Sequence, residues 1–106
     1  MGVADADAFY NKLKGEVNMR AVVTVMGRDK TGIIARTSTL LADNGINILD
    51  ITQTIIQDIF TMVMLVELAK DTEIAVISEK LDVLAGELGV EIRIQHEDIF
   101  NSMHRN

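Results

Sequence analysis

Two short polar motifs in this chain have the residue types that bind small molecules. The first is the loop GRDKTG at residues 27–32, between an apolar run and an amphipathic pattern. The N–H groups at a helix start attract a carboxylate, and a glycine such as Gly32 lets a ligand approach the backbone. Asp29 can accept hydrogen bonds from an ammonium group. The loop therefore suits an α-amino acid, although Asp29 and Thr31 are also ordinary helix-capping residues.

The second motif is Asn47, which stands between Ile46 and Ile48 in an otherwise apolar run. Its side chain carries both a donor and an acceptor, as the backbone of an amino acid requires. The alternative interpretation is a turn or edge-strand asparagine that satisfies local backbone groups. Each motif taken alone fits both interpretations.

Other kinds of chemistry have little support. His96 and His104 lie eight residues apart without a ligand set around them, which favours surface histidines over a metal site. Met62 and Met64 are typical of core or interface filling. We find no Ser–His–Asp set, no paired carboxylates and no phosphate-binding loop. The sequence therefore predicts a protein that is not an enzyme and uses no cofactor or metal.

Composition limits the possible partners. The chain has 106 residues, 48% of them hydrophobic, which is enough for one domain with one core. A net charge of -6 argues against binding to nucleic acid. Asp5 and Asp7 stand where a signal peptide would have its apolar core, and no apolar run is long enough to cross a membrane. The chain has no cysteine, so it can form no disulfide. We therefore expect a soluble, cytoplasmic protein without membrane or nucleic-acid partners.

Hydrophobic periodicity predicts six regular elements. Two are helices: one starts near Thr31 or Gly32 and ends at Asn44–Gly45, and the other follows Asp71–Thr72 and stops at Gly89. The four strands are predicted at residues 20–26, 46–57, 59–68 and 90–95. The apolar phase of the second strand slips between Ile48 and Leu49, which indicates a β-bulge.

This β-α-β-β-α-β order predicts an α+β, ferredoxin-like sandwich: a four-stranded antiparallel sheet with two helices on one face. The first and third strands should be central. Residues 59–68 are apolar on both faces, so the face away from the helices should be covered as well. Candidates are a final helical segment bearing Ile99, Phe100 and Met103, a second subunit, or both. A homodimer is expected. Residues 1–18 are interpreted as an extension, and residues 19–106 as the single domain.

Three other roles of this topology fit poorly. RNA-recognition modules need exposed aromatic residues in basic surroundings, and this chain is acidic with 4% aromatic residues. A heavy-metal chaperone would need a cysteine pair in the first loop. An acyl-phosphate hydrolase would need a glycine-rich cradle beside Arg28, and none is present.

The segment VTVMGRDKTGIIARTSTLLADNGINILDITQ resembles the opening of an ACT domain, a small regulatory module of amino-acid metabolism. The matching residues are Asp29 and Gly32 in the loop and Gly45, Asn47 and Ile48 at the second strand. The resemblance extends over residues 19–96, and residues 19–106 as a whole look like the stand-alone ACT-domain proteins of bacteria and archaea.

The resemblance implies a binding site for an amino acid at a subunit interface. It would be formed by residues that match the family's positions, with their neighbours: Asp29, Thr31, Gly32, Ile33, Asn47 and Ile48. Two departures stand out. Gly27 occupies the place of a histidine in one ligand-binding subgroup, and Thr31 replaces a frequent proline. Many ACT domains only dimerise, so a ligand-free module acting on an unidentified enzyme or regulator is the alternative.

Overall fold

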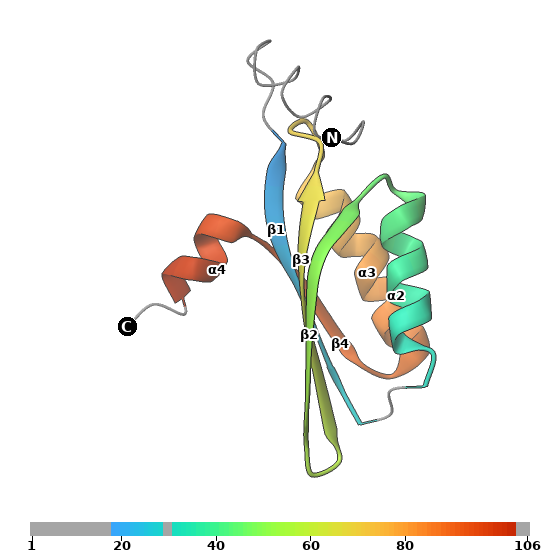
Figure 1. Cartoon of the computed structure of the whole chain (residues 1–106). Coiled ribbons are helices and arrows are strands. Elements are labelled where there is room, and N and C mark those ends of the chain that lie inside the picture. The colour runs from blue at the N-terminus through green and yellow to red at the C-terminus, as the bar shows by residue number, and fades with distance from the viewer. Residues whose placement is uncertain (1–17, 29–30, 104–106) are drawn as a thin grey trace, which may run out of the picture.

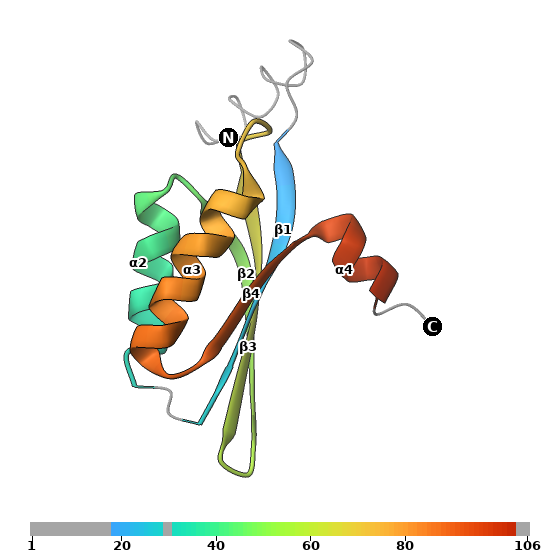
Figure 2. The ribbon, with the colours of Figure 1, turned by 180° about the vertical axis from the view of Figure 1, so that it is seen from behind.

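The structure is a computed structural model that describes residues 18–28 and 31–103. Its four strands form one antiparallel sheet in the spatial order β2-β3-β1-β4. Their bounds are Met19–Gly27 for β1, Asn47–Ile56 for β2, Ile59–Leu68 for β3 and Glu91–His96 for β4. Helices α2 (Ile33–Asp43) and α3 (Ile74–Leu88) cover one face, and α4 (Glu97–Met103) lies on the other (Figures 1 and 2). The predicted ferredoxin-like fold is confirmed.

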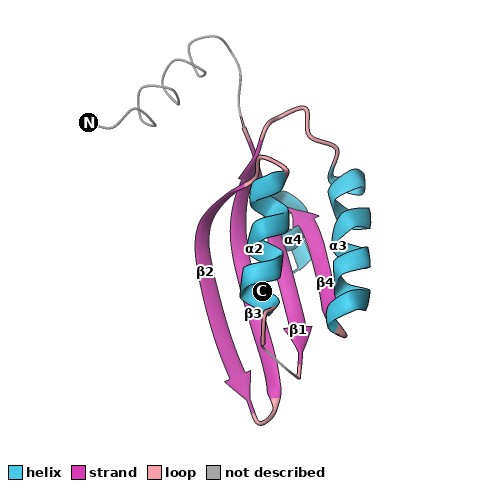
Figure 3. Cartoon of the chain, turned by 90° about the vertical axis from the view of Figure 1, so that its right-hand side faces the viewer, coloured by secondary structure: helices cyan, strands magenta, loops and turns pink. Residues whose placement is uncertain are grey.

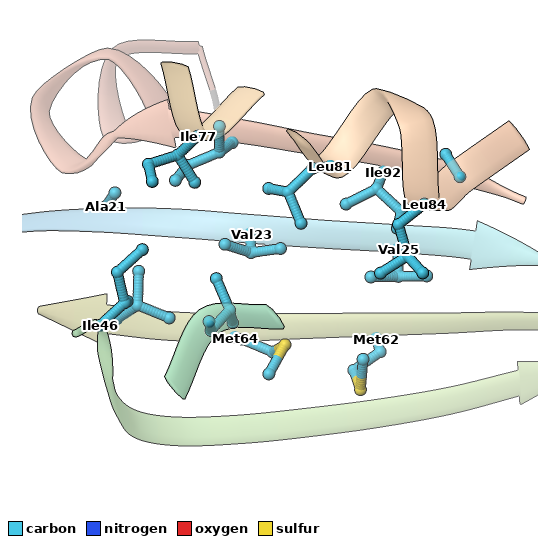
Figure 4. Packing of buried hydrophobic residues seen from close by; sticks show 14 of the residues in the cluster. Ala21, Val23, Val25, Ile46, Met62, Met64, Ile77, Leu81, Leu84 and Ile92 are labelled. Atoms are coloured by element: carbon cyan, nitrogen blue, oxygen red, sulfur yellow. The ribbon is translucent and has the colours of Figure 1, made fainter. Parts of the chain in front are cut away.

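The core lies between the sheet and the two long helices. Alternate residues of the central strands, such as Val23 and Met64, are fully buried and point at the helices. Leu81 and Leu84 of α3 pack onto the same layer (Figure 4). The apolar residues that the sequence spaces three and four apart therefore form the face of α3 that packs against the sheet.

Helix α2 ends at a glycine, as the sequence predicted. Gly45 adopts a left-handed φ of 72°. Its N–H donates to the carbonyl of Ala42 at 3.0 Å, and the N–H of Ile46 donates to the carbonyl of Leu41 at 2.9 Å. This pair of hydrogen bonds is a Schellman motif. It reverses the chain and places Asn47 at the start of β2.

Strand β2 contains the predicted bulge. Its pairing with β3 shifts between Ile48 and Asp50, so Leu49 is the extra residue. The shift restores the apolar phase, because it puts Ile51 opposite Met64 on the helix-covered face. Strand β2 is nevertheless exposed along most of its length and stands at the outer edge of the sheet (Figure 3).

The second face of the sheet is partly covered by the chain itself. Val63 and Leu65 on this face of β3 are half-buried. The C-terminal segment forms α4, as predicted, and its Phe100 is half-buried while Ile99 and Met103 remain exposed. Coverage by a second subunit stays a prediction.

Some expectations fall outside the described residues, namely those on the extension up to residue 17, on Asp29 and on His104. Within residues 18–28 and 31–103, no helix is long and apolar enough to span a bilayer.

Candidate ligand site at the starts of helix α2 and strand β2

The start of α2 is built on Gly32. This residue is the N-cap, with a left-handed φ of 76°, and its carbonyl accepts the N–H of Arg36 at 2.9 Å. A glycine has no side chain with which to cap the helix, and a β-carbon placed on Gly32 would find no atom of the described residues within 4 Å, its two chain neighbours aside. The backbone at this position therefore faces open space, where a ligand's carboxylate could approach the helix start.

The neighbours of Gly32 divide between core and surface. The Ile33 side chain is buried to 1% exposure and anchors the helix start in the core, so only its backbone N–H can face a ligand. Thr31 is exposed. Asp29 lies outside the described residues, so its contact with an ammonium group stays a prediction.

Asn47 opens β2 and its side chain is exposed. It pairs with Glu67 of β3, and Glu67 in turn pairs with Arg20 of β1. Directly paired residues share a face, and Arg20 alternates with the buried Ala21. Asn47 therefore lies on the face opposite α2 and α3. The adjacent Ile48 is half-buried against the core.

The surroundings of Asn47 are acidic. Arg20 forms an ion pair with Glu97 of α4. The hydrogen bond and the negative charge of Glu97, and then the charge of Glu67, raise the pKa of the Arg20 guanidinium. The guanidinium is thus paired with Glu97 and lies near a second carboxylate, that of Glu67. Sequence reasoning did not include Glu67 or Arg20 in the site, because only the strand register brings them to Asn47.

The two halves of the predicted site are far apart within one chain. Gly32 and Asn47 lie at opposite ends of α2 (Figure 1). The helix has 11 residues, which corresponds to a rise of about 16 Å. An amino acid is much shorter than this, so it cannot contact both residues of the same chain.

Gly27 is required by packing. A β-carbon on this residue would lie 2.4 Å from Cγ1 of Val90 in the loop before β4. A histidine therefore cannot replace Gly27 unless Val90 moves. A cavity of about 320 Å³ borders this contact, with Arg28, Ile59 and Gly89 among its lining residues. The sequence carries no local signal for this contact, because the two residues are distant in the chain.

The described residues contain no group of three or more His, Asp or Glu side chains able to hold a metal ion. The polar groups at the two ends of α2, namely backbone N–H groups at its start and the Asn47 amide beside Glu67 at its end, are of the types that bind the charged groups of a zwitterion.

Comparison with known proteins identifies the family. The ACT domain model matches residues 20–95. A UPF0237 protein of Clostridium acetobutylicum is 51% identical over 88 residues, which are 82% of this chain and 99% of that protein. One from Methanosarcina acetivorans is 47% identical over 87 residues, covering 81% of this chain and 95% of that protein. The chain belongs to the ACT domain family and is similar to these stand-alone members.

Comparison with solved structures agrees with this family assignment. An ACT domain protein from Streptococcus pneumoniae superposes with a TM-score of 0.73 at 36% identity, covering 79% of this chain and 96% of that one. A formyltetrahydrofolate deformylase from Burkholderia mallei has a TM-score of 0.64 at 16% identity, covering 74% of this chain and 28% of that one. The second likeness concerns the fold alone.

Proposed function

We propose that this protein is a non-catalytic, cytoplasmic regulatory module that binds an amino acid between the two chains of a homodimer. The loop before α2 would come from one chain and Asn47 from its partner. Binding would favour the dimer arrangement in which both chains contact the ligand, and that change would be the regulatory signal.

The observation that carries this proposal is the separation of Gly32 and Asn47 along α2. A two-fold axis beside β2 would run the two β2 strands antiparallel, so that the start of one lies near the far end of the other. The start of β2 in each chain, which carries Asn47, would then lie at the end of the partner's sheet where α2 begins. One ligand could contact both motifs only in such an arrangement.

The edge of β2 supports the same arrangement. An exposed edge strand is a template for pairing with another chain. Leu49, Ile51 and Ile55 are 42%, 38% and 55% exposed, and an antiparallel β2 pair would reduce their contact with water.

The charges define how an amino acid would lie. Its carboxylate would face the first N–H groups of α2, at Gly32 and Ile33. Its ammonium group would face Asp29 and the acidic surroundings of the partner's Asn47, where Glu67 lies across the strand pair. This orientation places each charged end of the ligand beside groups of opposite charge.

The alternative is a ligand-free module that dimerises or docks on a metabolic enzyme or a transcription regulator. The exposed β2 edge favours it, because backbone pairing needs no small molecule.

A thermal-shift screen with the common amino acids, followed by calorimetry, separates the two functions. A ligand at 100 times its dissociation constant should stabilise the fold by about 2.7 kcal/mol. The variant Asp29→Ala/Asn47→Ala should lose this gain, whereas Asp82→Ala/Asn101→Ala, with the same changes at exposed positions of α3 and α4, should keep it. Absence of any selective shift would favour the ligand-free module.

Mixed dimers test whether the site is shared. A dimer of one Asp29→Ala chain and one Asn47→Ala chain would contain one fully intact site and one doubly altered site. We expect calorimetry to give one ligand per mixed dimer and none for either variant alone. Failure of the mixed dimer to bind would contradict a site formed by two chains.

A further inference from the structure

A second cavity, of about 390 Å³, lies between α4 and the sheet face opposite α2 and α3. It is separate from the described part of the site proposed above, because Thr31, Gly32, Ile33, Asn47 and Ile48 do not line it. Figures 1 and 2 show α4 projecting from the end of β4 on this side of the sheet. The cavity is lined by residues of β1, β3, β4 and α4: Thr24, Thr61, Val63, Arg93, Gln95, Phe100 and Met103.

Contacts at both ends of α4 hold it in place as the outer wall. At the start, Nε of Arg20 donates to Glu97 at 2.9 Å, and Nδ1 of His96 accepts the N–H of Asp98 at 3.1 Å. At the end, Nε2 of Gln95 donates to Sδ of Met103 at 3.2 Å. The space under α4 is therefore bounded by specific contacts.

The lining combines apolar walls with a few polar groups. Val63, Phe100 and Met103 offer apolar surface, and Thr24 supplies a hydroxyl beside the cross-strand neighbour Arg93. Among the described residues that line the cavity, none carries a carboxylate. An ammonium group placed there would find no negative partner, whereas a carboxylate would find a guanidinium.

Arg93 differs from the other arginines in the described part of the chain. Arg93 forms no ion pair with a carboxylate there, although the protein has 16 acidic and 10 basic residues. Glu91, two positions away in β4, lines a neighbouring cavity with Arg93 but forms no ion pair with it. The other described arginines each have a partner: Arg20 with Glu97, Arg28 with Asp58, and Arg36 with Glu87.

We propose that this cavity binds a small monocarboxylate that has an apolar tail and no amino group. The guanidinium of Arg93 would hold the carboxylate with charge-assisted hydrogen bonds, and the tail would lie against Val63, Phe100 and Met103. The volume is at the lower end of the range for small-molecule sites. The protein would then distinguish an amino acid at one site from an acid without an amino group at the other.

Hexanoate, hexylamine and norleucine test the proposal, because they have unbranched alkyl tails and differ in their charged groups. Each would be titrated into the isotope-labelled protein and followed by NMR. We expect hexanoate to shift the signals of Val63, Phe100 and Met103, and the other two probes to leave them unchanged. Equal shifts with hexylamine, or no shift with hexanoate, would overturn the proposal.

Variants at two exposed arginines provide the matched comparison. Arg93→Gln should weaken hexanoate binding about tenfold, because the charge is lost while an amide remains. Arg36→Gln, at an arginine on α2 that is paired with Glu87, should leave binding unchanged. An equal loss in both variants would contradict a specific role for Arg93.

Sedimentation distinguishes a ligand from a second copy of the chain as the occupant. If a partner chain filled the cavity, Met103→Lys would lower the oligomer mass in the absence of any probe, and the proposal would fail. We expect the mass to stay the same. The variant Asp29→Ala/Asn47→Ala should still bind hexanoate, so failure of the amino-acid site and failure of this one can be told apart.

Discussion

The two edge strands of the sheet, β2 and β4, have very different surroundings. Strand β4 has six residues, and its Ile92 and Ile94 are buried in alternation with exposed side chains. Strand β2 has ten residues, and all of them except the half-buried Ile48 are exposed. One edge is short and continues directly into α4, while the other presents a long row of backbone groups and apolar side chains.

The same contrast extends to the helices. Helix α3, beside β4, has 15 residues and buries Ile77, Leu81, Leu84 and Ala85. Helix α2, on the β2 side, has 11 residues and begins at a glycine that faces open space. The α3/β4 half therefore buries more of its helix and strand, whereas the β2 edge leaves more backbone and apolar side chains exposed.

The largest expected effect comes from changing the β2 edge. Ile51→Lys/Ile55→Lys would remove apolar contacts and place like charges across the proposed β2 pair. We expect the dimer dissociation constant to rise at least about a hundredfold, or about 2.7 kcal/mol. Sedimentation equilibrium measures this. Val76→Lys/Val83→Lys changes two exposed valines of α3 and should leave dimerisation unchanged; the reverse result would place the interface on the other half.

A smaller effect, on the stability of the fold, is expected from a change at Gly27, where the end of β1 lies against Val90 before β4. Gly27→His would place a β-carbon against Val90, and overpacking of this kind costs about 2 kcal/mol. Urea unfolding would show the loss. Adding Val90→Ala removes the closest contacting atom. The double variant should therefore lose less unfolding free energy than the two single variants lose when their losses are added. Strict additivity would show that the two residues do not press on each other.

The smallest expected changes in stability come from replacing one glycine in each half of the molecule. Gly32→Ala forces a side chain into a left-handed conformation and should cost about 1 kcal/mol. Gly86→Ala, inside α3 with nothing within 4 Å of the added carbon, should gain about 0.5–1 kcal/mol. Denaturant midpoints should move in opposite directions. Movement in the same direction would mean that Gly32 does not hold the conformation described.

Much of the fold could be predicted from local patterns. Ile74, Ile77 and Leu81 predicted the apolar face of α3, because residues three and four apart share one side of a helix. Gly45 and Gly89 marked the helix ends, since both adopt left-handed conformations there. The shifted phase at Ile48 and Leu49 located the bulge.

The candidate site could be predicted only in part. Residue types identified Gly32 and Asn47, and the family match agrees with the resemblance that those residues suggested. That Glu67 stands beside Asn47 followed only from the register of strands that are distant in the sequence.

The order of elements, the helix faces and the turn residues are properties of the sequence alone, because they depend on contacts between residues close together in the chain. The tertiary structure decided three other features: the distance between Gly32 and Asn47, the contact between Gly27 and Val90, and the cavity beside Arg93. Each depends on how strands far apart in the sequence are placed against one another. Local propensity carries no information about that placement, since packing of the whole chain determines it.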